Sequence, residues 1–150
     1  MKNQNKFYYW VLQNKLCIGR APKDLNQLST LEDEGIRSII SLCLIENKNL
    51  KSQMIKKFCC EEIVLPDHRS KQIPTFEEVN KALIKLEYFV DNLFPVFIHC
   101  EMAVERSPLI CIAYLMKYKK LNLHQATDYM MRVCPSTNPL QSQLEIIKHI

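Results

Sequence analysis

A cysteine and an arginine separated by five residues follow a short apolar run in the second half of the chain. The run at residues 96–98 is typical of a buried strand, and it leads directly toward Cys100. Arg106 and Ser107 then open an apolar stretch, residues 107–118, that is typical of a buried helix. A loop of this length between a strand and a helix can direct its backbone N–H groups and the helix N-terminus at one bound oxyanion.

These residue types favour phosphoryl transfer. The guanidinium of Arg106 is planar and can hold two oxygens of a phosphate at once. Together with the loop amides and the helix end, it would keep Cys100 as a thiolate near neutral pH. A thiolate beneath a bound phosphate is a nucleophile toward phosphorus. The sequence therefore predicts Cys100 as the nucleophile of a phosphate-binding loop formed by Glu101, Met102, Ala103, Val104, Glu105 and Arg106.

His99 and Ser107, the neighbours of this loop, each have more than one role open to them. His99 suggests a cysteine–histidine catalytic pair, but adjacent residues at a strand end point to opposite faces. We therefore expect His99 to turn into the scaffold and to brace the loop by hydrogen bonds. Ser107 fits a helix cap.

Cleavage of a phosphoester also needs a proton for the leaving oxygen, and the same group can then activate water. Asp67 is the candidate, because it follows an apolar strand and Pro66 and opens the polar loop at residues 67–72. The alternative is an ordinary turn aspartate after a proline. His68 and Arg69 are candidates for the rim of the site.

The rest of the chain predicts an α/β fold in a single domain, residues 1–150, with a central, mostly parallel sheet flanked by helices. Thr75 and Glu78 form a capping box for a helix that Pro95 closes, Gly35 fits as a helix stop, and Asn122 fits as a cap. A last helix is expected to begin at Asn138-Pro139, with Leu140, Leu144 and Ile147 facing inward. The predicted strands are residues 7–12, 16–18, 37–45, 59–65 and 96–98, and further helices are expected at residues 24–34, 47–58 and 107–118.

Composition excludes several classes of protein. The net charge is +4, and no basic block interleaved with aromatic residues predicts nucleic-acid binding. The longest apolar run is too short to span a membrane, and residues 1–15 lack the apolar core of a signal peptide, so we expect a cytoplasmic protein. The seven cysteines form no C-x-x-C pair and no metal-ligand spacing, which indicates reduced thiols, no metal and no cofactor.

The segment from His99 to Ser107 resembles the His-Cys-x5-Arg-Ser signature of the cysteine-dependent protein tyrosine and dual-specificity phosphatases. Residues 10–12, 15–16 and 19–22 look like the opening of compact bacterial and plant members, and residues 134–140 look like the turn that follows the signature. The resemblance implies a phosphocysteine intermediate on Cys100, with Asp67 as general acid and base. It implies that Ser107 steadies the departing thiolate and that Asn138 lies near the phosphate. The implied substrate is a phosphorylated protein or a small phosphoester; its phospho-residue and the oligomeric state are left open.

The loop departs from the family pattern at Ala103, where most members have glycine. A Cβ in a left-handed conformation costs about 1 to 2 kcal/mol. Glu101 and Glu105 also place two carboxylates on the loop, which we interpret as disfavouring polyanionic substrates. The alternative function is therefore a phosphate-binding pseudophosphatase that acts as an interaction module. Rhodanese or arsenate reductase chemistry is a third possibility, although those proteins use a different loop spacing or cysteine position.

Cys43 is a candidate for redox regulation. In some relatives a cysteine in a similar Leu-Cys context forms a reversible disulfide with the nucleophile, so the resemblance suggests a Cys43–Cys100 pair. The alternative is a core cysteine that contributes only packing.

Overall fold

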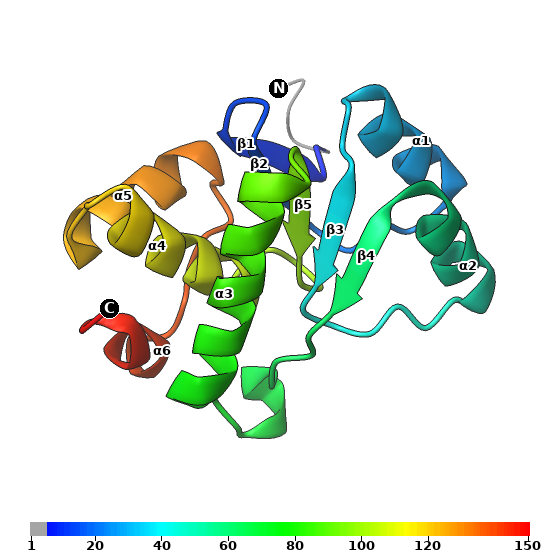
Figure 1. Ribbon diagram of the computed structural model, residues 1–150. Helices are drawn as coiled ribbons and strands as arrows, with labels where there is room; N and C mark the ends of the chain where they lie inside the picture. The colour runs from blue at the N-terminus through cyan, green and yellow to red at the C-terminus, as the bar shows by residue number, and fades with distance from the viewer. Residues whose placement is uncertain (1–5) are drawn as a thin grey trace.

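The computed structural model describes residues 6–150, and within this range it is a five-stranded sheet with helices on both faces (Figure 1). The strand order is β1-β2-β5-β3-β4. β1 pairs antiparallel with β2, and the remaining neighbours are parallel. The strands are β1 (Tyr8–Leu12), β2 (Leu16–Gly19), β3 (Ser38–Ser41), β4 (Cys59–Glu62) and β5 (Val96–His99). The predicted α/β class and mostly parallel sheet are confirmed.

Two helices cover one face of the sheet, and four cover the other (Figure 1). Successive strand residues alternate between the two cores: Phe97 packs with α1 and α2, whereas Ile98 packs with α3 and α4. The helices are α1 (Leu25–Asp33), α2 (Lys48–Lys57), α3 (Phe76–Asn92), α4 (Arg106–Tyr118), α5 (Leu123–Val133) and α6 (Gln141–Ile147), with a 3-10 turn, η1 (His68–Ser70), between β4 and α3.

β5 occupies the centre of the sheet, so the loop that follows it, with Cys100, starts at the middle of one sheet edge. His99 is in register with Gly19 of β2 on one side and with Ser41 of β3 on the other. The loop after β5 therefore starts in the middle of the edge formed by the carboxyl ends of the parallel strands, where ligands of open α/β sheets bind. Every residue of α4 from Arg106 to Met116 is buried, so the loop is fixed at both ends by the core.

Most of the helix signals in the sequence are confirmed. The Thr75 hydroxyl accepts from the Glu78 N–H, and the Glu78 carboxylate accepts from the Thr75 N–H. Asn122 caps α5, and Gly35 follows α1 with a φ of 89°. These capping groups satisfy N–H donors or adopt a backbone conformation that a continuing helix cannot provide.

The strand and helix ends are less well predicted. β3 and β4 stop at Ser41 and Glu62 instead of at residues 45 and 65, because the ladder ends where β5 passes into the loop. The prediction that the last helix begins at Asn138-Pro139 is wrong, because Leu140 is the N-cap residue of α6, and the Asn138 N–H donates to the Val104 carbonyl at 2.8 Å. α6 begins three residues later, and Leu140 is 38% exposed instead of facing inward.

In the described part of the chain, no helix is both long enough and apolar enough to cross a membrane. Residues 1–5 of the segment considered for a signal peptide lie outside the described residues. All seven cysteines are free thiols, and five of them are buried.

Candidate active site

Two loops enclose a cavity of about 180 Å³ beyond the carboxyl end of β5. The phosphate loop, residues 100–105, connects β5 to α4. The acid loop, residues 66–72, follows β4 and contains η1. The lining residues are Asp67, His68 and Arg69 from the acid loop and Cys100, Glu101, Met102, Val104, Glu105 and Arg106 from the phosphate loop and the start of α4.

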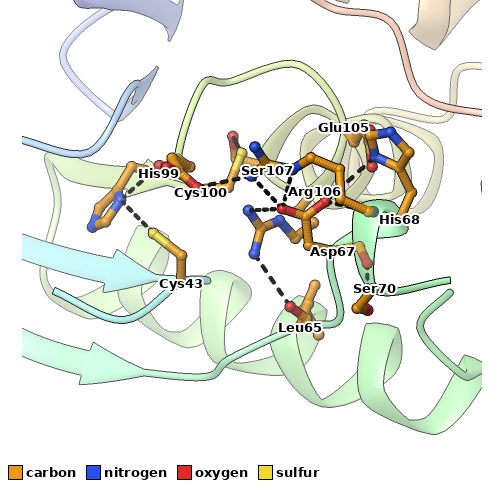
Figure 2. A network of polar contacts seen from close by, with 12 residues as sticks. Cys43, Leu65, Asp67, His68, Ser70, His99, Cys100, Glu105, Arg106 and Ser107 are labelled. Carbon is orange, nitrogen blue, oxygen red and sulfur yellow. Dashed lines mark hydrogen bonds and ion pairs between the residues drawn. The ribbon is translucent and has the colours of Figure 1, made fainter. Parts of the chain in front are cut away.

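Cys100 lies at the base of this cavity and is only 2% exposed. Its Sγ lies 3.2 Å from the Ser107 Oγ, and either atom can donate the hydrogen bond (Figure 2). Ser107 is fully buried in the first turn of α4, where helix N–H groups lack intrahelical partners. The hydroxyl at the start of α4 therefore faces the sulfur.

Arg106 carries a buried guanidinium in the wall of the cavity, with 7% of the residue exposed. Its Nη1 donates to the Leu65 carbonyl at 3.3 Å, and its Nη2 lies 3.6 Å from the Asp67 Oδ2. The segment after β4 therefore fixes one side of the guanidinium and leaves the charge to face the cavity.

Asp67 lies opposite the phosphate loop, within the η1 turn that it caps. Arg69 donates three hydrogen bonds to this carboxylate, two from its side chain and one from its backbone. These bonds, with the charge of Arg106, lower the pKa of Asp67 to about 2. Asp67 is therefore ionised at neutral pH in this arrangement.

His99 is fully buried and turns away from the cavity. Its Nδ1 lies 3.0 Å from the Cys100 carbonyl, which can only accept, so Nδ1 carries the proton. Its Nε2 then accepts from the Ser41 hydroxyl at 2.7 Å. Burial lowers the pKa of His99 to about 4, so the ring is neutral and connects β3 to the start of the loop.

Ala103 adopts the left-handed conformation, with a φ of 58°, and is 1% exposed. The turn after α5 braces it: the Ser136 hydroxyl donates to the Ala103 carbonyl at 2.6 Å. Asn138 supports the neighbouring Val104 through its backbone N–H, while the residue itself is exposed and does not line the cavity. The Ala103 Cβ is thus held at positive φ, where the left-handed strain expected from the sequence applies.

We expect Ala103→Gly to change the free energy of unfolding by less than about 1 kcal/mol. Relief of about 1 to 2 kcal/mol of left-handed strain is offset by loss of a buried methyl, about 0.8 kcal/mol, and by the entropy of a more flexible unfolded chain. Ala103→Val should instead cost about 2 kcal/mol or more, because a β-branched residue is poorly accommodated at positive φ in a packed site. Urea denaturation of the three proteins checks both values; equal stability of the valine variant and the parent would contradict the expectation.

The two carboxylates of the phosphate loop are both paired. Glu101 is exposed and accepts from the Arg69 Nη2 at 2.9 Å. Glu105 is buried, contacts the His68 Nδ1, and accepts from the Gln143 Nε2 at 3.0 Å. Pairing reduces the repulsion that each carboxylate exerts on a bound phosphate.

Cys43 lies beside His99, with its Sγ 3.9 Å from Nδ1 (Figure 2). Burial raises the pKa of this thiol to about 11. It lines a second groove of about 510 Å³, which shares Asp67, Glu101 and Arg106 with the cavity. The disulfide with Cys100 stays a prediction.

Within residues 6–150, one group of side chains has donor atoms suited to a metal ion. Asp67, His68 and Glu105 bring one oxygen or nitrogen each to within 4.8 Å of one another. The spacing of cysteines and histidines did not predict this group, because Glu105 comes from a different loop than Asp67 and His68. It overlaps the acid loop, so a cation bound there would engage the Asp67 carboxylate.

Several supporting residues were not recognised in the sequence. Ser41, Ser136 and Gln143 each bond to the signature segment from elements far away along the chain. The capping signal of Gln143 at the start of α6 was available, but its link to Glu105 depends on the tertiary fold.

A buried cysteine directly after the central strand, under a loop that ends in a buried arginine, is the arrangement expected of the cysteine-dependent protein tyrosine and dual-specificity phosphatases. A family model described as the dual specificity phosphatase catalytic domain matches residues 16–148. The chain belongs to this family.

The chain is similar to proteins that are longer than itself. It is 54% identical to human dual specificity protein phosphatase 5 over 35 residues, 23% of this chain and 9% of that protein. It is 23% identical to phosphatidylglycerophosphate phosphatase PTPMT1 of Arabidopsis thaliana over 137 residues, 89% of this chain and 40% of that protein. The chain thus spans less than half the length of either relative.

Solved structures share the fold at low identity. The crystal structure of Tk-PTP in the active form superposes with a TM-score of 0.80 at 20% identity, covering 97% of this chain and 96% of that one. PTPMT1 in complex with PI(5)P superposes with a TM-score of 0.76 at 17% identity, covering 95% and 93%.

Proposed function

We propose that this chain hydrolyses phosphomonoesters without a metal, through a phosphocysteine intermediate on Cys100. The observation that carries the proposal is the cavity itself, in which a buried sulfur, a buried guanidinium and a carboxylate from a separate loop face one another. Each of the three roles that the chemistry needs, namely nucleophile, oxyanion holder and proton donor, has a side chain there.

In the first step the Cys100 sulfur attacks phosphorus and the ester P–O bond breaks. Asp67 donates its proton to the leaving oxygen, while Arg106 and the loop amides hold the equatorial oxygens. In the second step Asp67 accepts a proton from water, the water oxygen bonds to phosphorus, and the S–P bond breaks. The Ser107 hydroxyl, 3.2 Å from the sulfur, stabilises it as it leaves.

The low pKa of Asp67 is compatible with proton donation, because a bound substrate would change the surroundings of the carboxylate. A dianionic phosphate would take over Arg106, which lies 3.6 Å from the carboxylate, and would itself repel the ionised form. Both changes favour protonation of Asp67 once the substrate is bound. Arg69 opposes them, because its hydrogen bonds are the largest cause of the low pKa.

We therefore expect Arg69→Leu to move the basic limb of the pH profile of kcat, which reports the substrate complex, to higher pH. Removal of the arginine raises the pKa of Asp67, so a larger fraction of the acid stays protonated as the pH rises. The profile is measured with para-nitrophenyl phosphate. Glu101→Gln leaves the Arg69 to Asp67 bonds intact and should not move the limb, and an unmoved limb in Arg69→Leu would contradict the assignment.

The proposed substrate is a phosphorylated protein, with tyrosine or dual specificity, or a small phosphoester. The short cavity, with its acid loop at the rim, admits a phosphate on an extended side chain, and the adjoining groove offers room for the residues beside it. Names of similar proteins include both protein phosphatases and a lipid-phosphate phosphatase. Seven free thiols fit a reducing, cytoplasmic location.

The test is hydrolysis of para-nitrophenyl phosphate in EDTA with dithiothreitol, by the unchanged chain beside Asp67→Asn. Turnover is expected with chelator present, and the aspartate variant should lose about 10²-fold or more. Inorganic phosphate that binds without any turnover would overturn the proposal and favour a pseudophosphatase.

A further inference from the structure

Glu105 is an acidic side chain in an unusual place. It is 9% exposed, stands next to Arg106, and lines the cavity that would hold a phosphate. A buried carboxylate is costly unless its oxygens are hydrogen-bonded, and here it would also face a bound phosphate. A role that uses both of its oxygens would account for its position.

One oxygen is held by α6. The Gln143 Oε1 accepts from the Leu140 N–H at 2.7 Å, which fixes the orientation of the side-chain amide. Its Nε2 must then point the other way, and it donates to the Glu105 Oε1 at 3.0 Å. Gln143 is fully buried, so this bond is shielded from water and aims the carboxylate.

The other oxygen reaches the acid loop. The His68 Nδ1 contacts the Glu105 Oε2 and lies 3.4 Å from the Asp67 Oδ1 (Figure 2). His68 is the first residue of η1, and Asp67 caps that turn by accepting from the Arg69 N–H at 3.0 Å. The Ser70 and Lys71 N–H groups close the turn onto the carbonyls of Asp67 and His68. A shift of His68 would therefore carry Asp67 with it.

A second connection between the two loops exists but is exposed. Arg69 pairs with Glu101 at 2.9 Å, and their side chains are 62% and 56% exposed. Solvent and salt screen such a pair, so it contributes little. The Glu105 side chain is 11% exposed, and its contact with His68 is the better protected of the two.

We infer that Glu105, oriented by Gln143, latches the acid loop onto the phosphate loop through His68 and so positions Asp67 for proton transfer. Glu105 and His68 are positioning residues in this account, because they act through Asp67. The inference rests on the proposed phosphatase function and adds the device that aligns its acid.

The test compares a poor and a good leaving group in EDTA, so that no divalent cation can bridge the three side chains. Phenolate needs a proton as it leaves, whereas nitrophenolate needs far less help. We expect Glu105→Gln, whose amide offers one acceptor in place of two, to lower kcat/KM for phenyl phosphate about tenfold more than for para-nitrophenyl phosphate. His68→Leu should do the same, and His68→Gln, which keeps a donor, should restore most of the loss. Glu101→Gln, with the same charge change on the same loop, should leave the ratio of the two rates unchanged.

Amide hydrogen exchange gives a readout that does not need turnover. Exchange at Ser70 and Lys71 should speed up in Glu105→Gln and His68→Leu but not in Glu101→Gln. If the unchanged chain shows no turnover but exchange is still faster in both variants, the latch stands and the proposed phosphatase function is overturned. An active parent whose two-substrate ratio and exchange are unchanged in both latch variants would overturn the latch and leave the function standing.

Discussion

Cys100→Ser is expected to lower the turnover of para-nitrophenyl phosphate by about 10⁴-fold or more, because serine lacks the nucleophilic sulfur and no base stands beside it. His99 cannot serve as that base, since its ring turns toward Ser41 and donates to the Cys100 carbonyl. Binding of inorganic phosphate should persist, because Arg106 and the loop amides are retained. Steady-state kinetics and calorimetric titration with phosphate measure the two effects separately.

The matched control is Cys59→Ser. Cys59 is an exposed thiol on β4 and should be replaceable without loss of rate. Equal loss in both variants would indicate general damage by removal of a thiol. Full activity of Cys100→Ser would contradict the assignment of the nucleophile.

Arg106→Ala is expected to lower kcat/KM by about 10³-fold, and Arg106→Lys by about 10²-fold. The guanidinium offers two parallel N–H groups to a phosphate, whereas a lysine ammonium provides charge without this fork. The alanine variant should also bind inorganic phosphate much more weakly. This result would distinguish the binding role of Arg106 from the role of Cys100, because replacement of Cys100 should leave phosphate binding intact.

Arg106 also supports the structure, because its Nη1 donates to the Leu65 carbonyl. Thermal unfolding must therefore accompany the kinetics, and the lysine variant, with its retained charge, should remain folded. Arg132→Ala removes a 70% exposed arginine from α5 and should change neither rate nor binding. Normal phosphate affinity in a folded Arg106→Ala protein would contradict the role proposed for the guanidinium.

Local signals in the sequence predicted the framework well. The capping box at Thr75, the stop at Gly35 and the apolar run before Cys100 each act over a few residues, and each matches the structure. The nearly continuous apolar sequence of α4 predicted a buried helix, because almost no face of it can meet water. Strand lengths were overestimated at residues 37–45, because hydrophobicity continues past Ser41 while its ladder partner ends at His99.

Tertiary contacts were harder to predict. Asn138 looked like a helix cap, but its N–H is used by the Val104 carbonyl of the phosphate loop. Glu105 was interpreted only as a loop carboxylate that disfavours polyanionic substrates, whereas its buried oxygen is held by Gln143, which lies 38 residues further along the chain. The orientation of His99, by contrast, followed from the alternation of side chains at a strand end, and the structure has it facing Ser41.

The most direct test of the account is to trap the covalent intermediate. Asp67→Asn lacks the base that activates water, so the phosphocysteine should accumulate when this variant is mixed with para-nitrophenyl phosphate and quenched in acid. Peptide mass spectrometry is predicted to find one phosphate, attached to Cys100 and absent from the Cys100→Ser protein. Continued turnover with no phosphate on Cys100, or phosphate attached to a different residue, would contradict the central claim.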